Sequence, residues 1–223
     1  MSDRNPRLGL TQRVTVIEEY GERRDCLDQA WTTLLEEWGY QPIPLPNTVA
    51  DVDTYLNSLD LDGVILTSGN DLSHLEDAAV PAPERDEFES AVLDWALEHS
   101  VPVLGVCRGL ELLNHYFGGS LSPVEDHVAT THEVTFSDAD EEYHAGLPFP
   151  EQMMVNSYHD YGIVSEDVAQ PLDVLGTAPD GSIECLGHPD EPLLGIMWHP
   201  ERDTPSSDRD QQLFEYLFRG DTR

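Results

Sequence analysis

Residues 101–119 read VPVLGVCRGLELLNHYFGG and contain the clearest strand-to-helix junction of the chain. The apolar run 101–106 predicts a buried strand, and 110–117 predicts a helix that stops at Gly118. Cys107 lies between them, flanked by Gly105 and Gly109. Because glycine permits a sharp turn and close backbone contact, this order predicts a nucleophile elbow. A helix N-terminus favours a thiolate, so we expect a lowered pKa at Cys107.

Outside this junction, short apolar runs alternate with amphipathic stretches of helical length. Together they predict an α/β fold with a mostly parallel sheet covered by helices, in a single domain over residues 1–223. In the first half we expect strands over 8–14, 43–45 and 63–67, and helices over 27–38, 49–59 (capped by Asn47) and 84–99. In the second half we expect strands over 134–136, 153–156, 173–178, 183–187 and 193–198, and a last helix over 207–219, capped by Ser206 or Ser207.

The charge of the chain is its most unusual bulk property. The 223 residues contain 44 Asp and Glu but only 11 basic residues, all Arg, which gives a net charge of −33. Such a charge argues against binding nucleic acid or an anionic membrane. At molar salt the screening length falls to about 3 Å, so the composition indicates a protein from a salt-accumulating halophile. The alternative is an acidic mesophilic protein, which usually still carries some lysine.

Cysteine spacing and hydropathy both indicate the cellular compartment in which the protein is expected. No apolar run approaches the length of a membrane span, and the polar N-terminus lacks the apolar core of a signal peptide. Cys26, Cys107 and Cys185 are widely spaced and form no CxxC pair, which fits a reducing cytoplasm, and we assign Cys26 and Cys185 to packing. The nine histidines show no metal-ligand spacing, so we expect no metal and no cofactor.

A thiolate nucleophile needs a base, and the base needs a group that orients it. His199 and Glu201 follow the predicted strand 193–198 and are separated by Pro200. In an extended segment, residues two apart point to the same side, so the two side chains can project together. We expect His199 to act as the base and Glu201 to orient it.

Three motifs in this order, TSGND at 67–71, GVCRG at 105–109 and WHPE at 198–201, resemble those of the class I glutamine amidotransferase superfamily. The chain is most similar to its γ-glutamyl hydrolase branch, which includes the γ-glutamyl-γ-aminobutyrate hydrolases. The resemblance implies a flavodoxin-like three-layer αβα fold and a Cys107–His199–Glu201 triad. It also implies an oxyanion hole made by the backbone amides of Gly69 and Arg108, although relatives usually have Gly-Gly where this chain has Ser68-Gly69.

The same resemblance points to substrate-binding residues. Asn156, Ser157 and His159 match a family loop near the substrate pocket, so we expect all three to bind substrate. Glu111 stands where the superfamily typically has Gln. It either accepts hydrogen bonds from the substrate α-ammonium group or reflects the acidic bias of the whole chain. The segment 180–184 reads as a hairpin turn, and the sequence assigns no role to His127 or His132.

Arg13, Arg23 and Arg24 are conspicuous in a chain with so few cations. This region resembles a subgroup that includes γ-glutamyl-CDP-amidate hydrolases, and arginine suits bidentate contact with phosphate. The alternative is that these arginines pair with neighbouring carboxylates.

The resemblance leaves three functions open. The first is a free-standing cytoplasmic hydrolase that forms a glutamyl thioester on Cys107 and releases glutamate from a small-molecule γ-glutamyl amide. The second is a glutaminase subunit that supplies ammonia to a synthetase partner. The third is a non-catalytic binding module on the same fold, against which the intact Cys107, His199 and Glu201 argue. A homodimer and a synthetase partner both stay open.

Overall fold

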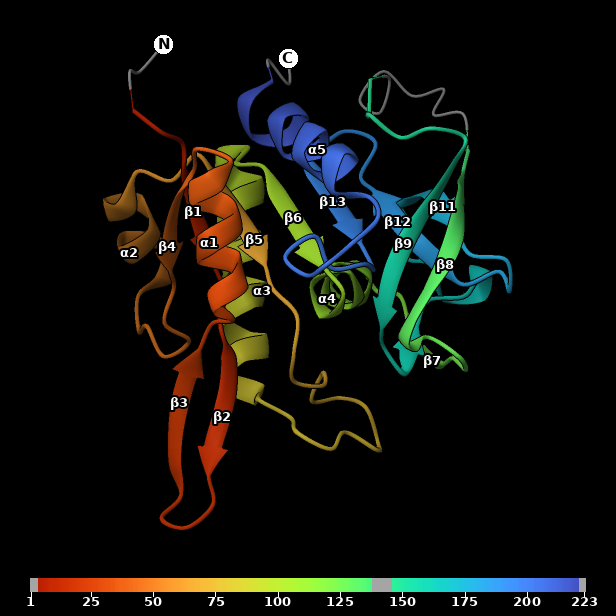
Figure 1. Cartoon of the computed structure of the whole chain (residues 1–223). Helices are drawn as coiled ribbons and strands as arrows, with labels where there is room; N and C mark the ends of the chain where they lie inside the picture. Colours follow the sequence, from red (N-terminus) through yellow and green to blue (C-terminus); the bar gives the residue numbers. More distant parts are fainter. Residues whose placement is uncertain (1–3, 138–145, 221–223) are drawn as a thin grey trace.

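The computed structural model describes residues 4–137 and 146–220, and one nine-stranded sheet runs through them (Figure 1). Five neighbouring strands are parallel, in the order β4 (Gln41–Pro44), β1 (Arg7–Leu10), β5 (Gly63–Leu66), β6 (Val103–Val106) and β13 (Leu193–Ile196). Four antiparallel strands continue the sheet, namely β12 (Ile183–Gly187), β11 (Asp173–Thr177), β8 (Val128–Phe136) and β9 (Gln152–Tyr158). The sheet therefore takes strands from both halves of the chain.

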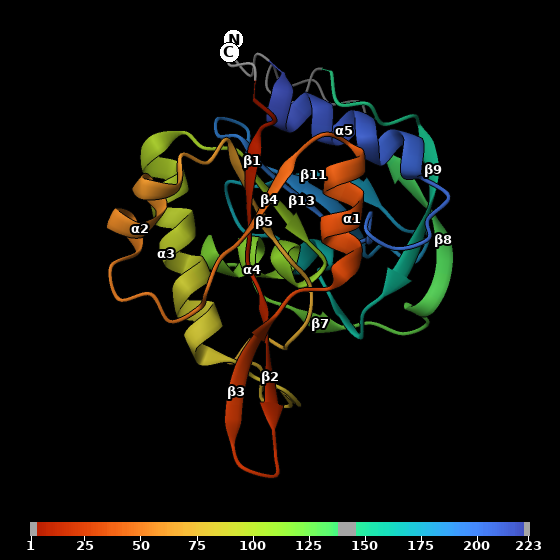
Figure 2. The ribbon, with the colours of Figure 1, turned by 60° about the vertical axis from the view of Figure 1, so that its left-hand side comes forward.

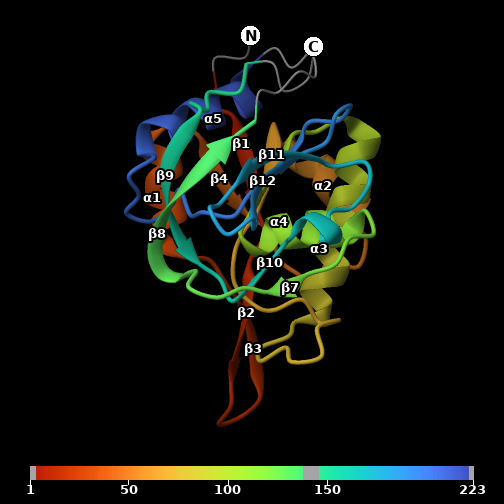
Figure 3. The same cartoon turned by 90° about the vertical axis from the view of Figure 1, so that its right-hand side faces the viewer.

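Helices cover both faces of this sheet, which makes three layers (Figures 1 and 3). On one face, α1 (Gln29–Glu37) and α5 (Ser207–Arg219) pack against alternate strand residues such as Leu8, Ile65 and Leu104. On the other face, α2 (Val52–Leu59), α3 (Pro83–His99) and α4 (Arg108–Tyr116) pack against the intervening residues, such as Val64 and Val103. Strand residues fully buried on both faces are typical of parallel sheets. The predicted flavodoxin-like α/β fold is confirmed.

The N-terminal region differs from the prediction. Instead of one strand over 8–14, β1 ends at Leu10, and β2 (Arg13–Ile17) pairs with β3 (Glu22–Cys26) in a separate hairpin that projects from the sheet (Figure 2). The break falls at buried Thr11, whose hydroxyl accepts a hydrogen bond from the Thr67 N–H at 3.0 Å. Both faces of β3 are largely exposed, so the hairpin lacks the hydrophobic alternation that predicts strands.

Helix α2 also begins later than predicted. Its N-cap is Asp51, whose carboxylate accepts the Thr54 N–H at 3.0 Å. The predicted cap, Asn47, instead donates its side-chain amide to Asp25 at 2.7 Å and to the Gln12 carbonyl at 3.0 Å. Three short elements were not predicted: β7 (Ser122–Pro123), β10 (Tyr161–Gly162) and the 3₁₀ turn η1 (Ser165–Asp167).

The parallel strands bring the predicted motifs to one edge of the sheet. The segment 67–71 follows β5, Cys107 follows β6, and His199 lies shortly after β13. Because β5, β6 and β13 are parallel neighbours, their carboxyl ends meet, which is where open α/β sheets bind ligands. Within the described residues, no helix is both long and apolar enough to cross a membrane.

Candidate active site

Cys107 occupies a strained turn between β6 and α4. Its φ of 52° and ψ of −106° lie outside the regions that L-residues favour. The flanking glycines allow this turn to pack tightly. A Cβ on Gly109 would lie 2.2 Å from the Leu66 carbonyl oxygen, and one on Gly105 would lie 2.6 Å from the Gly109 backbone. The strand–turn–helix geometry expected of a nucleophile elbow is therefore present at Cys107.

His199 and Glu201 form a buried pair, with His199 Nδ1 2.8 Å from Glu201 Oε1. Because an ionised carboxylate can only accept, His199 donates this bond from Nδ1, which in the neutral imidazole leaves the lone pair on Nε2. Among the described residues, Nε2 has no hydrogen-bond partner although it is buried. The pair therefore offers an oriented imidazole with one basic nitrogen free.

Asn156 fixes the backbone that carries this imidazole. Its Oδ1 accepts the His199 N–H at 2.8 Å, and its Nδ2 donates to the His199 carbonyl at 2.9 Å. Ser157 donates its hydroxyl to the His127 carbonyl at 2.7 Å. Neither Asn156 nor Ser157 lines the cavity beside Cys107, unlike the substrate contacts expected from sequence. The contacts they make are those of positioning residues.

A cavity of about 390 Å³ opens beside Cys107. Five predicted site residues line this cavity, namely Gly69, Cys107, Arg108, Glu111 and His159. His199 and Glu201 do not line it. The lining also includes Arg13, for which the sequence left phosphate contact and carboxylate pairing as alternatives, and four residues of the segment 158–161. The cavity is thus bounded by the segment after β5, the nucleophile turn and the loop between β9 and β10.

Burial dominates the ionisation of the cavity groups. It raises the pKa of the Cys107 thiol, and the nearby Glu111 charge adds to this, whereas a hydrogen bond from the Arg108 N–H acts in the opposite direction. The lowered pKa expected at Cys107 is therefore wrong. Burial also raises the pKa of Glu111 to about 7, against the opposing charges of His159 and Arg108. Near neutral pH, Glu111 is poised between its neutral and charged forms.

A buried charge cluster links the two halves of the predicted oxyanion hole. We define the Arg85 cluster as Arg85, Asp86, Glu89 and Arg108. The Arg108 guanidinium binds Asp86 and Glu89, and Arg85 Nε donates to Glu89 at 2.8 Å. Burial disfavours the Glu89 carboxylate, but the Arg108 and Arg85 charges outweigh it and lower its pKa.

Arg85 also holds the segment that carries Gly69. Its guanidinium donates to the carbonyls of Thr67 at 2.6 Å, Ser68 at 3.2 Å and Gly69. The Arg85 cluster therefore ties the Gly69 segment to the helix that begins at Arg108. Sequence reasoning missed this cluster, although the i, i+4 spacing of Arg85 and Glu89 on the predicted helix was a usable signal.

The family model for peptidase C26 matches residues 8–201. The chain belongs to the peptidase C26 family. Among its curated relatives, a Campylobacter jejuni protein named γ-glutamyl-CDP-amidate hydrolase is 35% identical over 199 residues, which cover 88% of this chain and 90% of that protein. The γ-glutamyl-γ-aminobutyrate hydrolase of Escherichia coli O157:H7 is 31% identical over 221 residues, covering 87% of this chain and 86% of that protein.

Solved structures agree with this family at the level of the fold. A GMP synthase-like protein from Thermoplasma acidophilum superposes with a TM-score of 0.70 at 18% identity, covering 98% of this chain and 96% of that one. A glutamine amidotransferase from Thermotoga maritima gives 0.63 at 14% identity, covering 95% and 83%. The predicted resemblance to the γ-glutamyl hydrolase branch is thus confirmed, and this peptidase C26 chain has a glutamine amidotransferase-like fold.

Proposed function

We propose that this protein hydrolyses a γ-glutamyl amide through a thioester on Cys107. The Cys107 sulfur attacks the γ-carbonyl carbon while His199 Nε2 takes the thiol proton. The backbone N–H groups of Gly69 and Arg108 stabilise the oxyanion. His199 then donates the proton to the leaving nitrogen as the C–N bond breaks. Water, deprotonated by His199, attacks the thioester, releases glutamate and restores the thiol.

The main support for this proposal is the geometry of His199. His199 keeps an unpaired Nε2 in a buried setting while Nδ1 binds Glu201 at 2.8 Å, which is the arrangement that a base for Cys107 requires. The raised Cys107 pKa fits a thiol that loses its proton to this base during attack rather than one that rests as a thiolate. Two relatives with 31–35% identity are named γ-glutamyl hydrolases, which supports a γ-glutamyl amide as the substrate class.

We further propose that the leaving group carries a phosphate that binds Arg13. Arg23 pairs with Glu84 at 2.5 Å and Arg24 pairs with Glu22 at 2.6 Å, so carboxylates already engage both. The Arg13 guanidinium makes no ion pair or hydrogen bond within the described residues 4–137 and 146–220. It lines both the Cys107 cavity and a neighbouring cavity of about 520 Å³ under the β2–β3 hairpin. An unpaired guanidinium between the two cavities suits an anionic leaving group such as a nucleotide phosphoramidate.

The experiment measures glutamate release in multimolar KCl, which we propose this acidic chain needs to fold. The substrates are glutamine, γ-glutamyl-aminobutyrate and a γ-glutamyl nucleotide phosphoramidate. Turnover should vanish in Cys107→Ala and persist in Cys26→Ala, whose thiol lies outside the cavity. If protein shown to be folded by circular dichroism released glutamate from none of the three substrates, the result would contradict the free-standing hydrolase and favour a partner-dependent glutaminase.

The phosphate contact has its own matched pair of variants. A charge-assisted hydrogen bond contributes about 1.5–3 kcal/mol, so Arg13→Ala should lower kcat/KM for the phosphoramidate roughly 10- to 100-fold. It should leave kcat/KM for γ-glutamyl-aminobutyrate nearly unchanged. Arg24→Ala removes a cation from the same hairpin and should change neither value. Equal losses for Arg13→Ala on both substrates would refute a contact with the leaving group.

A further inference from the structure

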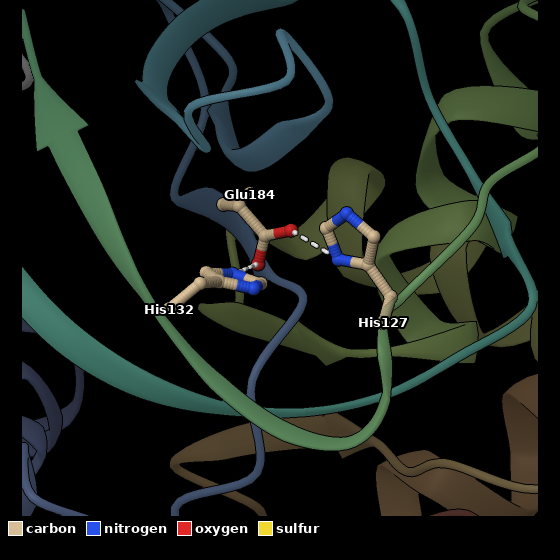
Figure 4. Close-up of side chains that lie close together, drawn as sticks. All are labelled: His127, His132 and Glu184. Atoms are coloured by element: carbon tan, nitrogen blue, oxygen red, sulfur yellow. Dashed lines mark ion pairs between the residues drawn. The ribbon is translucent and has the colours of Figure 1, made fainter.

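Two histidines and a glutamate outside the proposed triad gather beside the catalytic cavity. His127 precedes β8, His132 lies on β8, and Glu184 lies on β12 (Figure 4). Their nearest donor atoms all lie within 4.8 Å of one another. We call these three residues the His127 cluster. Its members come from separate elements, which is why the spacing of the nine histidines along the sequence predicted no metal.

Glu184 is the central member, and its surroundings are unusual for a carboxylate. The residue is fully buried, yet neither carboxylate oxygen accepts a hydrogen bond of normal geometry among the described residues. The nearest ring nitrogens are His132 Nε2, 3.3 Å from Oε2, and His159 Nε2 and His127 Nδ1, which lie 3.6 and 3.7 Å from Oε1. A buried carboxylate without hydrogen bonds is costly unless a positive charge compensates it.

These separations are too long for charge-assisted hydrogen bonds, which measure about 2.7–2.9 Å. They are close to the spacing of two ligands on one ion, because tetrahedral bonds of about 2.0–2.1 Å place neighbouring ligand atoms roughly 3.4 Å apart. The distances of 3.3 and 3.7 Å fall on either side of that value. All three ligand atoms lie within 4.8 Å of one another, so a bound ion would draw the widest pair closer together.

A contact between His127 Nε2 and Asp180 orients the ring so that the other nitrogen, Nδ1, can serve as a metal ligand. Nε2 lies 2.9 Å from Asp180 Oδ2, and the ionised Asp180 can only accept, so His127 donates from Nε2. In the neutral ring the lone pair then lies on Nδ1, which is 3.7 Å from Glu184 Oε1 and 3.4 Å from the Ser157 hydroxyl oxygen. A carboxylate that holds the outer nitrogen of an imidazole is the usual support of a metal-bound histidine.

We propose that His127, His132 and Glu184 form a site for a divalent transition metal, with Zn²⁺ as the occupant that two imidazoles and a carboxylate favour. Three protein ligands leave a fourth position for water. The site adjoins the catalytic cavity through His159, which lines that cavity and whose Nε2 lies 3.6 Å from Glu184 Oε1. A bound ion would thus fix one wall of the cavity. This inference does not depend on the proposed hydrolysis.

The test measures Zn²⁺ binding to the full chain by equilibrium dialysis in molar KCl. Excess Mg²⁺ occupies the surface carboxylates, and the Cys107→Ala background prevents thiolate binding of Zn²⁺ in the cavity. We expect one Zn²⁺ per chain, and His132→Ala should weaken binding at least about 100-fold by removing a ligand. Bound Co²⁺ should show the visible bands of a four-coordinate site without a thiolate charge-transfer band.

A second variant avoids the buried ligands altogether. Asp180→Asn changes a half-exposed side chain and should weaken Zn²⁺ binding about 10- to 100-fold, as outer-sphere changes do. Asp190→Asn, in the next hairpin turn, is exposed and should bind Zn²⁺ as the parent chain does. The proposal is overturned if the parent chain binds no stoichiometric Zn²⁺, or if His132→Ala and Asp180→Asn bind it as tightly as Asp190→Asn does.

Discussion

Replacing Glu111 by glutamine should stabilise the folded protein, and the gain should grow with pH. Burial raises the pKa of Glu111 from 4.5 to about 7, so the folded chain holds this proton more tightly than the unfolded chain. Stability therefore falls as pH rises from the unfolded toward the folded pKa, and it stays reduced above it. Glutamine has nearly the same shape but does not ionise, so the variant should not lose stability as the pH rises.

The size of the effect follows from the same two values. A folded pKa of about 7 against 4.5 corresponds to roughly 3 kcal/mol at about pH 8 and to roughly half of that at about pH 5.5. Urea unfolding of the parent chain and of Glu111→Gln at both pH values, at one KCl concentration, measures the two differences. The exposed Glu98→Gln also removes one negative charge and should stay within about 0.5 kcal/mol of the parent at both.

A gain from Glu111→Gln that is the same at both pH values, or that Glu98→Gln reproduces, would refute the burial account. Kinetics of the same variant separate the two hypotheses for Glu111. If its carboxylate binds the substrate α-ammonium group, KM should rise about 10- to 100-fold despite the greater stability. If the residue reflects only acidic bias, KM should not change. In both cases the lost negative charge lowers the Cys107 pKa, which should make proton transfer from the thiol to His199 easier.

Three further substitutions probe the geometry of the site. Gly109→Ala places a Cβ 2.2 Å from the Leu66 carbonyl oxygen, so the nucleophile turn must shift; kcat/KM should fall at least about 100-fold in steady-state assays. Asn156→Ala removes both hydrogen bonds to the His199 backbone, at 2.8 and 2.9 Å, and should lower kcat about 10- to 100-fold with little change in KM. Glu89→Gln leaves two buried guanidinium groups less compensated and should cost about 3–5 kcal/mol in urea unfolding.

Two of these substitutions have a matched control variant. Gly118→Ala lies at the end of the same helix as Gly109, where a Cβ meets nothing within 4 Å, and should affect stability but not kcat/KM. A comparable loss of kcat/KM in Gly118→Ala would contradict the clash at Leu66. Glu87→Gln is exposed on the same helix as Glu89 and should unfold as the parent does. An Asn156→Ala enzyme with an unchanged kcat would remove Asn156 from the positioning of His199.

Sequence reasoning succeeded where local pattern and tertiary burial agree. The strand ending at Val106, the antiparallel strands near the C-terminus and the last helix over 207–219 all carry a continuous apolar run or stripe. The β2–β3 hairpin was missed because Val14 is the one buried residue of β2 and no residue of β3 is buried, so Glu22–Cys26 reads as a charged loop. Asn47 resembled a helix cap locally, but tertiary contacts with Asp25 claim its side chain.

The sequence predicted the site residues that belong to local motifs, but not the clusters that form only through tertiary contacts. Motif order predicted that Cys107 and the His199–Glu201 pair meet at one edge of the sheet, because parallel strands align their ends. The Arg85 cluster was not found, since charges on a predicted helix are usually solvated, and nothing local shows that Arg85 and Glu89 are fully buried. The His127 cluster depends on the pairing of β8 and β12 with other strands, which sequence spacing does not encode.

The buried Arg85 cluster and the acidic surface of the molecule should respond differently to ionic strength. Salt screens charges in water over about 3 Å at molar concentration, but Arg85 and Glu89 have no exposed surface through which ions can act. Repulsion across the acidic exterior therefore weakens as KCl is added, whereas the attraction that joins the Gly69 segment to Arg108 stays the same. Catalytic rate per folded molecule should then remain constant over the range of KCl in which the folded fraction changes.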